Sequence, residues 1–152
     1  MELQEHLKGS FLFHRLTGEQ INAVASLARV VETSEGDVIW QRFSQDHSLL
    51  LVLEGTIETS GLAGAPTVSY GAGAVLGEAS LIDGNPTSVS ATVIQGGRIA
   101  LIPSFDLTSL LVEDDALRAQ VMQNLATLLC ERLRQAGVSL FDAGEAAVRR
   151  EA

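Results

Sequence analysis

The stretch Gly77–Val93, GEASLIDGNPTSVSATV, carries the most information about how this chain folds. It begins with a Gly-Glu pair, continues with small and aliphatic residues, and then has a turn that contains Pro86. Positive charge is missing around it, since no Lys or Arg occurs between Arg42 and Arg98, whereas five Asp and Glu residues do. The stretch therefore combines a glycine-led turn with an acidic neighbourhood.

Short runs rich in β-forming residues lie on both sides of this stretch, and glycines separate them. The runs are Val38–Trp40, Ser48–Leu53, Thr56–Thr59, Thr67–Tyr70, Ser90–Ile94 and Arg98–Ile102. We expect turns at Glu54-Gly55, at Gly71–Gly73 and at Gly96-Gly97, because glycine adopts turn conformations easily. Many short strands with glycine-rich turns predict a barrel or a β jelly roll.

Helical patterns flank the predicted strands. An amphipathic lead-in covers Leu3–Phe13, and Thr17–Gln20 has the sequence of a helix start. Phe105–Leu111 predicts a brief helix, and the pair Asp114-Asp115 opens a longer helix that reaches about Ala136. We expect a mainly β fold with flanking helices, with residues 1–112 forming the lead-in and jelly roll and residues 113–152 the C-terminal helix and tail.

The long helix carries two neighbouring apolar stripes. One contains Met122, Leu125, Leu129 and Leu133, and the other contains Leu117, Val121 and Leu128. Two apolar faces predict two burial partners, which would be the β domain and the same helix of a second copy. We therefore expect a homodimer through the first stripe. The alternative is one broad stripe that packs wholly on the β domain.

The order of these motifs resembles that of cyclic nucleotide-binding domains. Glu35–Ile39, EGDVI, is similar to the entry into the first strand of that family, and Leu49–Gly55, LLLVLEG, to its next strand and turn. Gly71-Ala72-Gly73 followed by Gly77-Glu78 resembles its G-x-G-x-x-x-G-E approach to the phosphate-binding cassette. The resemblance covers about Leu7 to Ala136. It implies the cyclic nucleotide-binding type of jelly roll, a cupin-like double-stranded β-helix with an N-terminal helix and a long C-terminal helix.

The resemblance also implies a ligand site in the cassette. In the family, a short helix after Gly-Glu offers backbone N–H groups to a phosphate, the Glu accepts a bond from a ribose hydroxyl, and an Arg binds the phosphate. The implied ligand is a cyclic nucleotide such as cAMP, and we expect no other cofactor. The candidate ligand-binding residues are Gly77, Glu78, Ala79, Ser80, Thr87, Ser88, Val89 and Ser90.

The Arg of the cassette is absent from this sequence. Counting forward from Gly77 places Thr87 at its position, and counting backward from Ser90-Ala91 places Val89 there. Charged hydrogen bonds contribute roughly 1.5–3 kcal/mol each. Losing a pair of them would weaken binding by about a thousandfold. Standard binding of cAMP or cGMP is therefore not expected, unless Arg42, Arg98 or a residue of the last helix folds over the site.

Two further departures concern the C-terminal part. In cAMP-responsive transcription factors, hydroxyl residues of the long helix contact the adenine, and here Ala136 and Gly137 stand near that position. Those regulators also carry a helix-turn-helix domain after the long helix, for which the sequence up to Ala152 has no room. We therefore do not expect DNA binding.

Composition narrows the range of functions. A chain of 152 residues with 46% hydrophobic residues is long and apolar enough for one globular core. The net charge of −9 argues against binding to nucleic acids or to anionic lipids. A single cysteine, Cys130, excludes an internal disulfide, and the sequence shows no signal peptide or transmembrane segment. We expect a cytoplasmic protein.

Signals for catalysis are weak. The three histidines, His6, His14 and His47, are scattered and lack metal-ligand spacing, so we expect no metal site. Cys130 lies beside the helical stripe and is interpreted as structural, and Trp40 as a core anchor. Glu78 has two readings, since its carboxylate could bind a ligand or could cap the amides of its own loop.

Three functional hypotheses remain. The first is a non-catalytic regulatory module with a diverged cassette, whose output is an unidentified partner protein or the dimer interface. The second is a genuine sensor of a cyclic nucleotide or of another small ligand, bound through Glu78, the amides of Ala79 and Ser80, and nearby hydroxyl groups. The third, a cupin-type enzyme, is disfavoured by the absence of clustered histidines.

Overall fold

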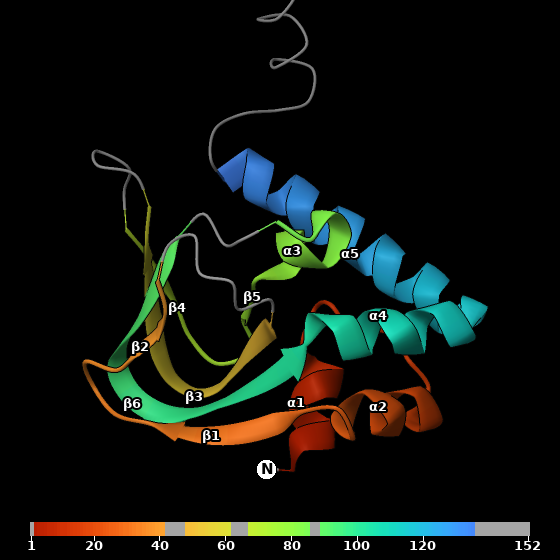
Figure 1. Cartoon of the computed structure of the whole chain (residues 1–152), viewed down its shortest axis with the longest axis horizontal. Coiled ribbons are helices and arrows are strands. Elements are labelled where there is room, and N and C mark those ends of the chain that lie inside the picture. The colour runs from red at the N-terminus through yellow and green to blue at the C-terminus, as the bar shows by residue number, and fades with distance from the viewer. Residues whose placement is uncertain (1, 42–47, 62–66, 86–88, 136–152) are drawn as a thin grey trace, which may run out of the picture.

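Two long strands, β3 (Ser48–Ser60) and β6 (Ser90–Pro103), form the centre of the sheet in the computed structural model (Figure 1). The structure describes residues 2–41, 48–61, 67–85 and 89–135. β3 and β6 run antiparallel, with Leu50 opposite Leu101 and Ile57 opposite Val93. The remaining strands, all antiparallel to their partners, are β1 (Arg29–Thr33) and β2 (Val38–Trp40) on β6, and β4 (Val68–Tyr70) and β5 (Val75–Leu76) on β3.

The helices gather at the end of the curved sheet where β6 leads into α4 (Figure 1). They are α1 (Leu3–Gly9), α2 (Gly18–Ala25), α3 (Glu78–Asp83), α4 (Ser104–Glu113) and α5 (Asp115–Gln135). The expected start of α2 is confirmed, because Thr17 and Gln20 form a reciprocal capping box. Asp114 caps α5 by accepting a hydrogen bond from the backbone N–H of Leu117. In the described part of the chain, no helix is both long and apolar enough to cross a membrane.

The prediction of a mainly β jelly roll with flanking helices is confirmed, but two of its turns are wrong. Glu54-Gly55 and Gly96-Gly97 do not end strands; they lie inside β3 and β6, where the pairing register shifts. A Cβ added to Gly55 would lie 2.5 Å from the carbonyl oxygen of Gln95, and one added to Gly97 would collide with the carbonyl of Glu54. The glycines therefore allow two bent strands to pass close together.

The apolar run in β3 separates two cores. Because side chains alternate across a strand, Leu49, Leu51 and Leu53 face a large core shared with the helices, and Leu50 and Val52 face the other side. The second core is smaller and contains Trp40, Ile57, Leu76, Ala91, Val93 and Ile99. The continuous apolar sequence of β3 is explained by burial on both faces.

The expected division of α5 into two stripes is wrong for Leu125. Leu117, Val121 and Leu125 are all buried in the large core. Met122 and Leu129 are partly buried against the same core, whereas Leu133 is 38% exposed. Much of the stripe that was assigned to a dimer is thus used within one chain, but Leu133 stays exposed and Leu128 is only partly buried, so the alternative of one broad stripe packed wholly on the β domain does not hold either.

Asn124 fixes α5 at its buried face. Its side-chain amide donates hydrogen bonds to the carbonyl oxygens of Leu12 and His14, at 2.9 and 2.8 Å, and its own oxygen accepts one from Gln120. These bonds tie the long helix to the N-terminal lead-in. They hold α5 in the direction that carries its last turn over the cassette.

Candidate functional site

The cassette begins at a glycine in the left-handed region. Gly77 has φ of +83°, and a Cβ at this position would lie 2.9 Å from the carbonyl oxygen of Ser48. Only glycine combines this conformation with such a close approach to neighbouring backbone. Gly77 therefore turns the chain from β5 directly into α3, which places Glu78 at the first position of that helix.

The short helix α3 is closed by bonds within its own loop. Gly84, with φ of +67°, ends the helix and donates its backbone N–H to the carbonyl of Ser80. The Ser80 hydroxyl donates to the carbonyl of Asn85 at 2.8 Å, and the Asn85 N–H donates to the carboxylate of Asp83 at 2.9 Å. The Ser80 side chain thus supports the loop.

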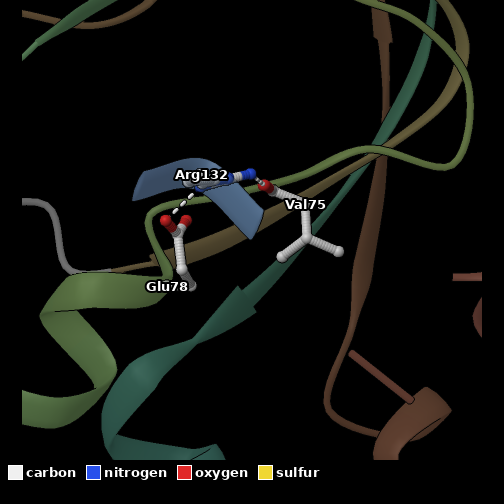
Figure 2. Close-up of polar contacts among 3 residues, drawn as sticks. All are labelled: Val75, Glu78 and Arg132. Atoms are coloured by element: carbon white, nitrogen blue, oxygen red, sulfur yellow. Dashed lines mark hydrogen bonds and ion pairs between the residues drawn. The ribbon is translucent and has the colours of Figure 1, made fainter. Parts of the chain in front are cut away.

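Glu78 is paired with an arginine that the sequence interpretation did not single out. The guanidinium of Arg132, in the last turn of α5, donates to the carboxylate of Glu78 through Nη1 and to the carbonyl oxygen of Val75 through Nη2, the latter at 2.5 Å (Figure 2). The side chain of Glu78 is 8% exposed and that of Arg132 is 25% exposed. Among the described residues, the partner of the Glu78 carboxylate is Arg132, so ligand binding and capping of its own loop both stay predictions for Glu78.

A third contact completes the environment of Arg132. The guanidinium carbon lies 5.6 Å from the centroid of the Tyr70 ring, within the range of a cation–π interaction. A carboxylate, a carbonyl oxygen and an aromatic face therefore surround one guanidinium group. Each of them is a favourable partner for a delocalised cation.

A cavity of about 410 Å³ opens beside this contact. Trp40, Tyr70, Leu76 and Val89 give it an apolar and aromatic wall, and Glu78, Asp83 and Arg132 are its charged residues. The volume lies within the range of small-molecule sites. Two carboxylates against one guanidinium leave the lining without excess positive charge, which disfavours an anionic ligand.

The structure brings together most of the predicted site residues that it describes. Gly77, Glu78, Ala79, Ser80 and Val89 all line the cavity. Ser90 begins β6 opposite Ser60 and is not among the lining residues. Thr87 and Ser88 lie outside the described residues, so the two possible registers of the missing Arg stay open.

A cation of the last helix, Arg132, lines the cavity and is paired with Glu78. Arg98, one of the three candidates, instead pairs with Glu54 at 2.6 Å on the surface, and Arg42 lies outside the described residues. Trp40 is 3% exposed, as expected for a core anchor, but it also lines the cavity. Among the described residues, no group of three His, Cys, Asp or Glu side chains could hold a metal ion.

Comparisons with known proteins agree with the fold. The sequence pattern of the cyclic nucleotide-binding domain matches residues 30–114, more than half of the chain. The chain belongs to the cyclic nucleotide-binding domain family. The cyclic AMP receptor protein of Thermus thermophilus is 29% identical over 138 residues, which are 88% of this chain and 62% of that protein. The chain thus spans less than two thirds of the length of this curated relative.

Solved structures show the same fold of the family. A candidate cyclic nucleotide-binding protein from Geobacter metallireducens is 30% identical, with a TM-score of 0.75 over 88% of this chain and 99% of that one. A cyclic nucleotide-binding domain from Methylobacillus flagellatus is 25% identical, with a TM-score of 0.74 over 88% and 77% of the two chains. The jelly roll is therefore that of the family.

Proposed function

We propose that this chain is a non-catalytic regulatory module of the cyclic nucleotide-binding domain family that lacks the standard phosphate clamp. The observation that carries the proposal is the pairing of the cassette carboxylate, Glu78, with Arg132 of α5. In the implied mode of binding, Glu78 accepts a bond from a ribose hydroxyl and a cassette Arg binds the phosphate. Here the carboxylate is already engaged, and Val89 contributes an apolar side chain to the cavity.

The charges of the site support the same conclusion. A cyclic phosphate placed in the cavity would meet Glu78 and Asp83, and Arg132 would have to leave Glu78 in order to neutralise it. The buried carboxylate of Glu78 would then exchange a charged guanidinium partner for one neutral ribose hydroxyl, so this exchange gains little. Cyclic AMP and cyclic GMP are therefore expected to bind weakly.

Calorimetric titration of the chain with cAMP and with cGMP tests this proposal. We expect no heat of binding at millimolar nucleotide, because loss of the clamp should reduce affinity by about a thousandfold. Binding at micromolar or lower concentration would overturn the proposal and would identify a nucleotide sensor.

Restoring the cassette arginine tests whether its absence is the cause of weak binding of cAMP. Val89→Arg and Thr87→Arg place a cation at the two candidate positions of the cassette. The variant in the correct register is expected to gain cAMP binding, because its guanidinium can form a bidentate bond to the phosphate. The matched variants Val89→Gln and Thr87→Gln add length without charge and should not gain binding.

A second candidate function is a sensor of an uncharged small ligand. The favouring observation is the cavity of about 410 Å³ with aromatic walls from Trp40 and Tyr70. Such walls bind apolar rings, and Glu78 offers an acceptor for a hydroxyl or amino group. A screen of uncharged nucleosides by the fluorescence of Trp40, the single tryptophan, would separate this function from that of an unliganded module.

The homodimer remains a prediction, with a smaller interface than the sequence suggested. Of the four residues assigned to it, Leu133 is exposed, and Met122 and Leu129 are only partly buried. Light scattering of the wild-type chain and of Leu133→Asp measures the molar mass of each and therefore the oligomeric state. A wild-type dimer that becomes monomeric in Leu133→Asp would support an interface at this end of α5.

A further inference from the structure

We infer that Arg132 is an internal ligand of the cassette, so that an external ligand on Glu78 and the docked last turn of α5 exclude each other. This inference rests on the proposed regulatory function and specifies how the site is regulated. The site is closed by a side chain of the same protein, and its output is the release of the end of α5.

The contacts of Arg132 are those of a bound ligand. Its guanidinium reaches a carboxylate of α3, a carbonyl of β5 and the ring of β4, all distant in the sequence from α5. Three-quarters of the side chain is removed from solvent, and Arg132 itself lines the cavity. Figure 2 shows the guanidinium between Glu78 and the carbonyl of Val75.

Arg132 attaches the last turn of α5 to the β domain, because of its place on the helix. Leu125 is the last residue of the helix that is buried in the core, and Leu129, one turn later, is only partly buried. Beyond it, Leu133 is 38% exposed and Arg134 has a side chain that is 69% exposed. In the described part of α5, Arg132 is therefore the main contact between the last turn and the β domain.

The charge of Glu78 decides what can replace Arg132. The Glu78 side chain is only 8% exposed, so a departing guanidinium must be replaced by other hydrogen-bond donors to its carboxylate. A ligand that opens the site must offer donor groups to Glu78, as a guanidinium, an ammonium or a pair of hydroxyl groups does. A phosphate group alone cannot do so.

Amide hydrogen exchange of the unliganded chain is the first test. Arg132→Met keeps the length of the side chain and removes its donors. Arg134→Met is the matched control, because the one partner of Arg134 within the described residues is Glu131 of its own helix, at 3.7 Å. We expect amides 132–135 to exchange at least about tenfold faster in Arg132→Met and in Glu78→Gln. The control should match the wild type, and circular dichroism verifies that each variant is folded.

Equal exchange in Arg132→Met and the wild type would overturn the inference, as would an equal acceleration in Arg134→Met. Glu78→Gln provides a second route, since it removes the charge from the other side of the pair. If Arg132→Met does not fold, exchange in Glu78→Gln decides by the same criterion. No cyclic nucleotide is used, so the outcome is separate from the calorimetric test of the proposed function.

Chemical rescue distinguishes an internal ligand from a purely structural ion pair. Arg132→Ala leaves the guanidinium site empty, and ethylguanidinium is the probe. We expect the fluorescence of Trp40 to titrate with ethylguanidinium in Arg132→Ala, but not in Arg134→Ala or in Arg132→Ala with Glu78→Gln. The end of α5 should still exchange fast when the probe is bound, because the probe is not attached to the helix.

Two results of the rescue would contradict the inference. If ethylguanidinium does not bind Arg132→Ala, the three partners of Arg132 do not form a ligand site. If the bound probe restores slow exchange at residues 132–135, Arg132 acts only by neutralising Glu78, and site occupancy is compatible with a docked α5.

Discussion

At the scale of single residues, Gly77 shows how backbone conformation builds the cassette. Its left-handed φ sets the start of α3, and the carbonyl of Ser48 lies where a side chain would begin. Gly84 offers a matched comparison, because it has a similar φ but open space around the position of a Cβ. A side chain at Gly84 would therefore cause only backbone strain, whereas a side chain at Gly77 would cause the same strain and also a collision with neighbouring backbone.

Substitution of these glycines by alanine gives the first prediction. Gly84→Ala should cost about 1–2 kcal/mol of unfolding free energy, from left-handed strain alone. Gly77→Ala should cost more, because the backbone at Ser48 must also move. Urea unfolding of the two variants measures the difference, and equal costs would show that the contact with Ser48 can relax freely.

Residue by residue, sequence reasoning found one half of the site. Gly77, Glu78 and Val89 were identified because they lie in one continuous motif. Arg132 lies 54 positions from Glu78, and its role depends on the direction in which α5 crosses the cassette. The only signal was that a cation was needed and that the last helix could provide one. Its identity could not be predicted, because no local pattern encodes that crossing.

At the scale of elements, α5 depends on one buried polar side chain. Asn124 is 6% exposed and satisfies the carbonyls of Leu12 and His14. Asparagine in an apolar stripe carries no helical advantage, so its place is explained by these bonds. The sequence interpretation included the leucines around it and overlooked Asn124.

The second prediction concerns this residue. Asn124→Ala leaves two carbonyl groups without their donor and should cost about 1–3 kcal/mol of unfolding free energy. Gln123→Ala, at the exposed neighbouring position, should change it by less than about 0.5 kcal/mol. Thermal and urea unfolding provide both values. A loss at Asn124 no larger than that at Gln123 would contradict the anchoring role.

The predicted and observed elements differ most in the long strands. Glycine marked a turn correctly at Gly71–Gly73, between β4 and β5, where the backbone N–H of Ala74 donates to the carbonyl of Gly71. The same residue at Gly55 and Gly97 marks a close crossing within paired strands. The sequence around a glycine does not distinguish a turn from a close approach between strands, because the close approach depends on which residues of the partner strand lie opposite.

At the scale of the whole molecule, the net charge of −9 means that few cations are present to pair with the many carboxylates. In the described part of the chain, two of these cations join elements that are far apart in the sequence: Arg132 joins α5 to the cassette, and Arg98 of β6 pairs with Glu54 of β3. The Arg98 guanidinium lowers the pKa of Glu54, through its hydrogen bond first and its charge second. This pair lies where the two central strands shift register.

The third prediction is the pH dependence of this pair. Because the pKa of Glu54 is lower in the folded state than its ordinary value of 4.5, the pair stabilises the fold above that pH. The stabilisation is lost as the pH falls through the folded pKa. Glu54→Gln should therefore be less stable than the wild type at neutral pH and equal to it in strong acid.

The effect of Glu54→Gln should be small and should shrink with added salt, because both side chains are substantially exposed, Arg98 at 34% and Glu54 at 56%. Urea unfolding at neutral and acidic pH, each at low and high salt, measures it. A difference that persists below the folded pKa would show that the variant acts through packing and not through charge.

Whether Arg132 occupies the cassette is tested most directly by nuclear magnetic resonance of the wild-type chain without ligand. Tyr70 is the single tyrosine, so its ring protons are an unambiguous probe of the guanidinium that lies 5.6 Å away. We predict nuclear Overhauser contacts between the Arg132 side chain and the Tyr70 ring, together with slow exchange of the Arg132 N–H protons. An Arg132 side chain that shows no contact to Tyr70 and exchanges as fast as that of Arg134 would contradict the account.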